Sequence, residues 1–235
     1  MFATFDTENF HQLCDLLGKK DSDLATVLNQ YSYPPLWSRP NTFESLIHII
    51  LEQQVSLASA LAAVNKLKEK IGEIRPELLL QLNDEEFKAC YFSRQKMAYA
   101  RDLAQKIVSG DLSLPQLALL DDDQIRTKLK SVKGIGDWTV DIYLLFILHH
   151  VDVFPLGDLA AVNAMKSLKK LPKKMDKIDL LAVTTQWKPY RTVAVMMLWH
   201  YYLEERKAGL TKKPVRQGQE KKSCLNRTGI SVCIY

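Results

Sequence analysis

Apolar residues recur along most of this chain at the three- and four-residue spacing of amphipathic helices. The clearest such segment runs over residues 43–55 and follows Thr42, a residue type that often caps a helix N-terminus. Its buried face is expected to carry Phe43, Leu46, Ile47, Ile50 and Leu51. No stretch keeps the two-residue alternation of a half-buried strand, so the pattern predicts an all-α protein of roughly ten helices.

The chain divides into three parts by composition. Two short N-terminal helices precede a connector at 31–40, whose three prolines exclude regular helix. We therefore expect residues 1–42 to form N-terminal helices that pack on a C-terminal helical subdomain, and residues 43–207 to form the core. Residues 206–222 hold seven basic residues against one acid, and no helical period follows. A basic, flexible tail is therefore expected over 208–235.

A pair of glycines lies near the middle of the chain, between two expected helices. Residues 133–136 (Lys-Gly-Ile-Gly) are expected to form a tight hairpin, and Ile135 would anchor it in the core. Gly134 and Gly136 suit a backbone at positive φ or in close approach to another group. A helix beginning at Asp137 would point its first N–H groups outward and create an anion site suited to phosphate. The alternative is an ordinary turn between helices.

Polar residues mark two other expected helix ends. Gln53 and Gln54 place consecutive amides after the apolar helix, where they could read base edges or sugars in a minor groove or simply tie a turn together. Asp158 follows Gly157 and precedes another helix, so on local grounds it is an N-cap residue.

Composition narrows the class of protein. The net charge of +5 and pI near 8.9 permit a polyanionic partner without requiring one. No apolar run reaches the ~18 residues of a membrane span, and no signal peptide opens the chain, so we expect an intracellular protein without membrane contact. The four cysteines and five histidines show no metal-ligand spacing. We therefore expect neither zinc nor an iron–sulfur cluster.

Five segments, in their order and spacing, resemble the helix-hairpin-helix superfamily of DNA glycosylases, and within it the alkylpurine branch, DNA-3-methyladenine glycosylase II. The segments are 50–56, 93–104, 132–139, 153–155 with Asp158, and 187–191. The resemblance covers about residues 43–205. It implies two helical subdomains with a cleft between them. It also implies a monomer that binds double-stranded DNA containing alkylated bases, in the bacterial cytoplasm or in a nucleus.

The resemblance also implies roles for individual residues. In the family, the aspartate at the position of Asp158 is catalytic, a role that is compatible with an N-cap. Trp138 is expected to form a wall of the base pocket, because an electron-deficient purine stacks well on an aromatic face. Trp187, Tyr190 and Trp199 are expected behind it, and a plain core role is the alternative for these three.

The residues expected to contact DNA are Gln53, Gln54, Arg94, Lys133, Gly134, Gly136 and Thr139. Among them Arg94, or its neighbour Phe92 or Ser93, is the candidate wedge that fills the space left by a flipped base. In relatives, backbone carbonyls of the hairpin bind a monovalent cation, Na or K, and no other cofactor is required. The matching residues are Lys130, Val132 and Gly134.

The implied chemistry is hydrolysis of an N-glycosidic bond in base excision repair. Family members that also cut the backbone carry a lysine two residues after the second hairpin glycine, and Trp138 occupies that position here. We therefore expect a monofunctional enzyme in which Asp158 stabilises an oxocarbenium-like sugar. The alternatives are a glycosylase of the same fold for another base, such as 8-oxoguanine or uracil, and a non-catalytic DNA-binding module that uses only the hairpin.

Overall fold

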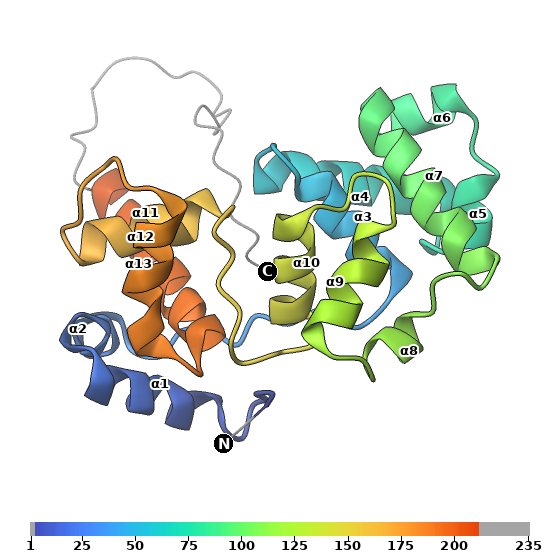
Figure 1. Ribbon diagram of the computed structural model, residues 1–235. Helices are drawn as coiled ribbons and strands as arrows, with labels where there is room; N and C mark the ends of the chain where they lie inside the picture. Colours follow the sequence, from blue (N-terminus) through green and yellow to red (C-terminus); the bar gives the residue numbers. More distant parts are fainter. Residues whose placement is uncertain (1–2, 212–235) are drawn as a thin grey trace, which may run out of the picture.

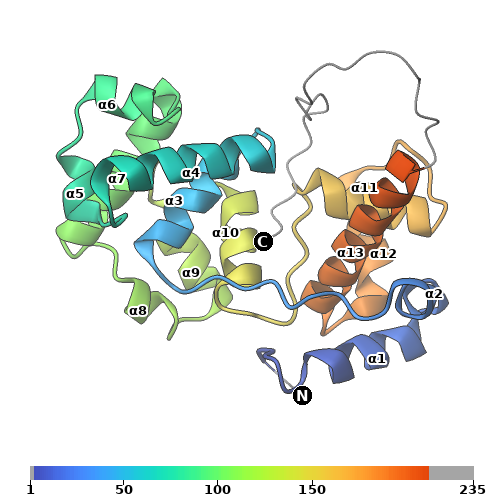
Figure 2. The same ribbon diagram turned by 180° about the vertical axis from the view of Figure 1, so that it is seen from behind.

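The protein folds into two groups of helices that lie side by side (Figures 1 and 2). The computed structural model describes residues 3–211, and its regular elements there are thirteen α-helices and one 3-10 helix. Within the same range the only β-type pairing is an isolated bridge between Thr4 and His150. The all-α prediction is confirmed. The number of helices exceeds the expected ten because several elements, such as the four-residue helix Leu114–Leu117, are too short to show a periodic pattern.

The first group, here named the hairpin subdomain, comprises α3 (Phe43–Glu52), α4 (Leu57–Ile71), α5 (Pro76–Leu80), α6 (Asp84–Ala89), α7 (Arg94–Val108), α8 (Leu114–Leu117), α9 (Asp122–Lys130) and α10 (Asp137–Phe146). The second group, the C-terminal subdomain, comprises α1 (Phe10–Lys20), α2 (Ser22–Tyr31), α11 (Leu159–Leu168), α12 (Lys177–Thr184), η1 (Thr185–Trp187) and α13 (Arg191–Thr211). The N-terminal helices α1 and α2 therefore pack against α13, far from them in sequence.

Side-chain caps define where most of these helices begin. Thr42 accepts a hydrogen bond from Ser45 N, and Ser93 accepts one from Lys96 N. Asn83 and Glu86 form a reciprocal capping box at the start of α6. Each cap satisfies an N–H group that has no partner within the helix and stabilises it by about 1 kcal/mol. The start at Thr42 agrees with the position expected from the sequence.

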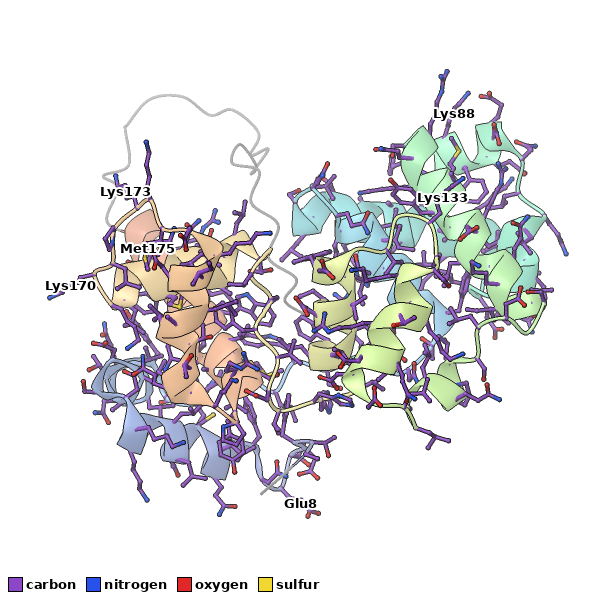
Figure 3. The ribbon with its side chains drawn as sticks, in the orientation of Figure 1. Glu8, Lys88, Lys133, Lys170, Lys173 and Met175 are labelled. Atoms are coloured by element: carbon purple, nitrogen blue, oxygen red, sulfur yellow. The ribbon has the colours of Figure 1, made fainter. Side chains whose placement is uncertain are left out.

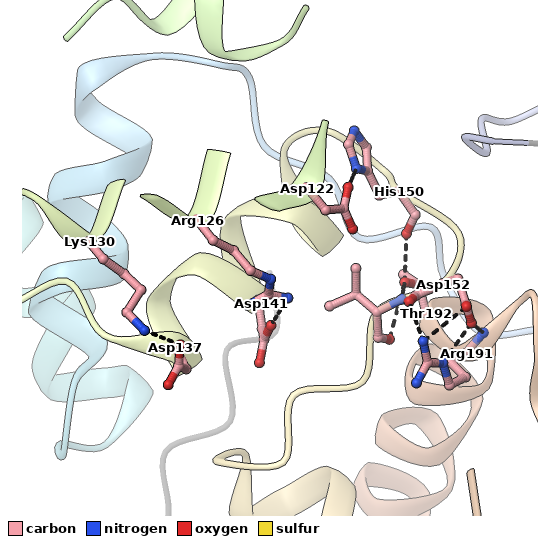
Figure 4. Close-up of polar contacts among 10 residues, drawn as sticks. Asp122, Arg126, Lys130, Asp137, Asp141, His150, Asp152, Arg191 and Thr192 are labelled. Atoms are coloured by element: carbon pink, nitrogen blue, oxygen red, sulfur yellow. Dashed lines mark hydrogen bonds and ion pairs between the residues drawn. The ribbon is translucent and has the colours of Figure 1, made fainter. Parts of the chain in front are cut away.

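The two subdomains meet through aromatic packing and through a crossing segment of chain. The ring of Phe146, at the end of α10, stacks on Trp199 of α13 with centroids 5.2 Å apart. The crossing segment 151–153 is held against the start of α13, because Val153 N donates to the Thr192 hydroxyl at 2.9 Å and Arg191 forms a 2.6 Å ion pair with Asp152 (Figure 4). This attachment fixes the approach of the chain to Asp158.

The last helix differs from expectation at both ends. The sequence pattern predicts it over 189–206, but α13 begins at Arg191 and runs to Thr211. The first residues of the expected tail, 208–211, are therefore helical. The remainder of the expected tail, from 212 on, lies outside the described residues. Among residues 3–211, no helix is both long and apolar enough to cross a membrane.

Candidate active site

A cavity of about 580 Å³ opens where the two subdomains face each other. It is bordered by the junction between α3 and α4, by the hairpin before α10 and by the start of α11. The lining residues are Gln53, Gln54, Val55, Tyr99, Gly134, Gly136, Trp138, Thr139, Gly157, Asp158 and Leu159. The cavity therefore brings together six of the residues expected to contact DNA or the base and the expected catalytic acid.

Asp158 lies at this cavity as the N-cap of α11 and is only 1% exposed. Its Oδ1 atom accepts hydrogen bonds from Ala161 N at 2.8 Å and from the Trp199 indole N–H at 3.1 Å. Its Oδ2 atom accepts one from the Trp138 indole N–H at 3.3 Å. Three donors from three helices thus fix the orientation of the carboxylate, and its N-cap role is compatible with a chemical one.

Burial raises the pKa of the Asp158 carboxyl above its ordinary value, even though the N–H groups of Ala161, Trp199 and Trp138 act to lower it. Desolvation disfavours the charged form because water is the better solvent for it. The same exclusion of water strengthens the field of the ionised carboxylate on any positive charge that develops nearby. This arrangement suits a group that stabilises a cationic transition state.

Trp138 forms one wall of the cavity and is held on two sides. Its Cβ atom lies 3.2 Å from the position that a Cβ on Gly157 would take, so a side chain there would crowd the tryptophan. Its indole is half-buried and donates to Asp158, as described above. The aromatic face and the carboxylate therefore belong to one rigid arrangement.

The two hairpin glycines have different roles. Gly134 has φ +80°, and an added Cβ would lie 2.2 Å from ring atoms of Tyr99. Both the conformation and the close contact require glycine there. Gly136 has φ −107°, which any residue adopts, and no heavy atom lies within 4 Å of the position that a Cβ would take. The expected positive φ is confirmed at Gly134 and wrong at Gly136, where only open space in front of the backbone distinguishes glycine.

Helix α10 starts without a side-chain cap, because Gly136 occupies the N-cap position. The Thr139 side chain in its first turn is buried and accepts a hydrogen bond from Gln53 Nε2 at 3.0 Å. This bond ties the Thr139 hydroxyl to the α3–α4 junction, and the backbone N–H of Thr139 lies in the first turn of α10. An uncapped helix start beside a cavity favours an anion.

The two glutamines at the α3–α4 junction have different surroundings. Gln53 Nε2 donates to Gly134 O and to Thr139 Oγ1, both at 3.0 Å, so this amide joins the junction to the hairpin. The structure thus favours the tying role for Gln53 over direct reading of bases. Gln54 is exposed at the cavity and has φ 57°, an uncommon backbone conformation for a residue other than glycine.

Several residues expected at the site lie elsewhere. Trp187 is fully buried and donates its indole N–H to Asp21 at 2.7 Å, so it belongs to the core of the C-terminal subdomain. Tyr190 and Arg94 are not among the residues that line the cavity. Phe92 is buried and packs edge-on against another ring, while Ser93 caps α7. Gln54, unlike Arg94 and its two neighbours, lies at the rim of the cavity.

Helix α7 contributes a set of contacts that the sequence did not reveal. Lys96 Nζ donates to Leu51 O at 2.6 Å, near the end of α3. One turn later Tyr99 covers Gly134, and one turn after that Asp102 accepts a hydrogen bond from Lys133 N at 2.8 Å. These side chains share one face of α7, because their spacing is three residues. They hold both loops of the cavity against one helix.

The hairpin carbonyls are oxygen donors of the type that a monovalent cation would need. Val132 O accepts a hydrogen bond from Ile135 N at 3.1 Å, and Gly134 O accepts one from Gln53. A carbonyl oxygen has two lone pairs, so each retains a site for a hard cation. No cluster of acidic, histidine or cysteine ligands that could hold another metal occurs among the described residues.

Fold and cavity together define a helix-hairpin-helix protein with an acid at the base of the cleft between its subdomains. The chain belongs to the HhH-GPD superfamily of base excision DNA repair proteins, whose family model matches residues 47–189. That match contains the hairpin, the junction glutamines and the buried aspartate.

Curated relatives and solved structures agree with this membership. The chain is 30% identical to a putative DNA-3-methyladenine glycosylase of Bacillus subtilis, YfjP, over 76% of this chain and 65% of that protein. It is 30% identical to DNA-3-methyladenine glycosylase 1 of Schizosaccharomyces pombe, over 75% of this chain and 79% of that protein. A structure of the S. pombe 3-methyladenine glycosylase in complex with abasic DNA superposes with a TM-score of 0.72 at 29% identity and covers 82% of this chain and 95% of that one.

Proposed function

We propose that this protein is a monofunctional DNA glycosylase that removes alkylated purines, such as 3-methyladenine and 7-methylguanine, from double-stranded DNA in base excision repair, acting as a monomer. The observation that carries the proposal is the buried carboxylate of Asp158, directed by three N–H donors at a cavity beside the glycine hairpin. The names of both curated relatives support the choice of substrate.

The chemistry follows from the charge of the substrate. An alkylated purine is already cationic, so it leaves with little help from a general acid. As its bond to C1′ breaks, positive charge moves to the deoxyribose ring. The ionised Asp158 stabilises that charge from a site with little water, and it can orient the attacking water molecule.

The target base must leave the helix to reach the acid, at a cost of a few kcal/mol that is smaller for a weakly paired, damaged base. The cavity volume of about 580 Å³ lies within the usual range for small-molecule sites. The Trp138 face stacks on the extruded, electron-poor purine, a contact related to cation–π attraction. Gln54, exposed at the rim, fills the gap left in the duplex.

The hairpin anchors the damaged strand. The open space in front of Gly136 admits a phosphate to the N–H groups at the start of α10. The carbonyls of Lys130, Val132 and Gly134 would hold a Na or K ion, which would supply positive charge next to that phosphate. Trp138 provides no amine that could form a Schiff base, so the backbone stays intact after the base has gone.

A panel of duplex oligonucleotides tests this function. Each duplex carries one modified base, and released base and strand breaks are measured separately. We expect release of 3-methyladenine or 7-methylguanine without strand cleavage. Release restricted to 8-oxoguanine or uracil would assign a different substrate, and binding of every duplex without release would identify a non-catalytic module. Strand cleavage together with a protein–DNA adduct that sodium borohydride traps would contradict the monofunctional mechanism.

A further inference from the structure

The end of α11 and the loop that follows it, here together named the lysine loop, concentrate positive charge. Residues 166–174 (Lys-Ser-Leu-Lys-Lys-Leu-Pro-Lys-Lys) contain five lysines and no acid. None of these lysines belongs to the cavity or to the hairpin that contacts it. The proposed reaction therefore leaves this loop without a role.

Two of the lysines build the loop and attach it to the fold. Lys169 Nζ forms ion pairs with Asp21 at 2.7 Å and Asp23 at 3.1 Å, which fastens the loop to the start of α2. Lys166 Nζ donates to Lys173 O at 2.9 Å and so closes the loop on itself. The backbone of the loop therefore has a defined position.

The remaining three, Lys170, Lys173 and Lys174, are exposed and form no ion pair with any acid of the described residues. This sets them apart from a second group of lysines, on α4, where each ammonium group has an acidic partner. Those pairs are Lys66–Glu69 at 2.6 Å, Lys68–Glu44 at 2.6 Å and Lys70–Glu86 at 2.8 Å. Charge on the loop is held in place but not neutralised.

The length of α11 sets the distance between the lysine loop and the acid. Asp158 caps one end of α11 and the lysine loop lies at the other end, so ten residues of helix separate them by about 15 Å. A duplex advances about 3.4 Å per base pair, so this span is about four to five base pairs. Figure 3 shows Lys173 and the hairpin residue Lys133 in the upper half of the view, Lys170 at its left edge and Glu8 at the bottom.

We propose that Lys170, Lys173 and Lys174 form a second duplex contact, which binds backbone phosphates about four to five base pairs from the extruded nucleotide, on one side of it only. The proposal rests on the proposed function, since it needs the duplex to be centred on Asp158. Phosphate contacts carry no sequence information. The loop therefore adds affinity and sets the direction of the duplex across the cleft, and it does not select the damaged base.

The test compares the wild type with the triple variant Lys170→Ala/Lys173→Ala/Lys174→Ala. The probe is a long duplex with a central tetrahydrofuran abasic analogue, together with two shorter duplexes, each ending about three base pairs beyond the analogue on one side, short of the reach of the loop. Affinity is measured across a series of salt concentrations. The control variant Lys66→Ala/Lys68→Ala/Lys70→Ala removes the same charge from paired positions.

On the long duplex, the loop variant should bind at least about tenfold more weakly at low salt, and the slope of log affinity against log salt should fall by about 2 to 3. Shortening one particular side should abolish the difference from wild type, and shortening the other should not. The single-turnover rate of base release at saturating protein should be unchanged. The control variant should stay near the wild type.

Equal losses in the loop and control variants would overturn the proposal, because general electrostatic attraction would then explain both. A loss that is independent of which side is shortened would overturn it as well. Failure of the proposed function has a different signature: the wild type would release no alkylated base although its binding still depended on duplex length and on the loop.

Discussion

Replacing Asp158 by Asn tests the central assignment with the smallest change of shape. The amide can keep its oxygen toward Ala161 N and the Trp199 indole, where Oδ1 lies now. Its NH₂ group would then face the Trp138 N–H, so one hydrogen bond of 3.3 Å is lost. That loss costs about 1 kcal/mol. Removal of a buried charge offsets it, so the variant should fold.

The effect on rate follows from the electrostatic energy of the transition state. A carboxylate about 4 Å from a unit positive charge contributes about 4 kcal/mol at an effective dielectric constant of about 20. The charge on the sugar is partial, but Asp158 is only 1% exposed, which strengthens the interaction. We therefore expect a loss of about three orders of magnitude in the rate of base release.

The assay is single-turnover release of 7-methylguanine from methylated duplex DNA, with binding to an abasic analogue as the control for folding and DNA contact. The pKa of Asp158 is raised by burial, and only the ionised form stabilises the cation. The wild-type rate should therefore fall as pH decreases through this raised pKa, and the residual rate of the variant should not. A variant rate within about tenfold of the wild type would refute the role of the carboxylate.

Five further substitutions, at four positions, test other parts of the hairpin subdomain. Gly134→Ala should lower both the melting temperature and the affinity for duplex DNA, because φ at Gly134 is +80° and the Tyr99 ring blocks a Cβ. Gly136→Val should leave the melting temperature nearly unchanged, because the space in front of Gly136 is open, and should weaken affinity about tenfold in the same binding assay. Tyr99→Ala should speed amide hydrogen exchange in the hairpin and weaken binding, while Tyr99→Phe should behave like the wild type, since the ring face makes the contact. Burial raises the pKa of Asp141 to about 6 despite its ion pair with Arg126. The folded state therefore binds a proton that the unfolded state releases, and the folded state loses stability as pH rises from about 4 through 6. Asp141→Asn should therefore raise the melting temperature more at about pH 8 than at about pH 5.

Local signals predicted the helices well. Thr42 begins a helix where its short polar side chain precedes apolar periodicity, because capping depends on residues within one turn. Where the last helix ends was harder to predict. Lysine and arginine are good helix formers, so the basic composition that follows Arg206 does not by itself end a helix.

The sequence could group site residues that are close along the chain, but not those that only the fold brings together. Trp138 and Gly134 lie in one short segment, and Asp158, which the resemblance marks, lines the same cavity, while the roles of these residues stay predictions. Trp187 was misplaced, because an aromatic residue near a motif looks the same whether it faces a pocket or packs on Asp21. Tyr99 was missed, although its position on a half-polar face of α7 is a signal that a helical projection could have revealed.

The indoles that hold the carboxylate come from opposite halves of the molecule: Trp138 from α10 and Trp199 from α13. Any hinge motion that widened the gap between those halves would pull the acid in two directions and break one bond before the other. The position of the Asp158 carboxylate therefore depends on how the two subdomains are placed relative to each other. A substitution far from the cavity that shifts either subdomain by a fraction of an ångström would move the Asp158 carboxylate through these two indoles, although no residue in contact with DNA is altered.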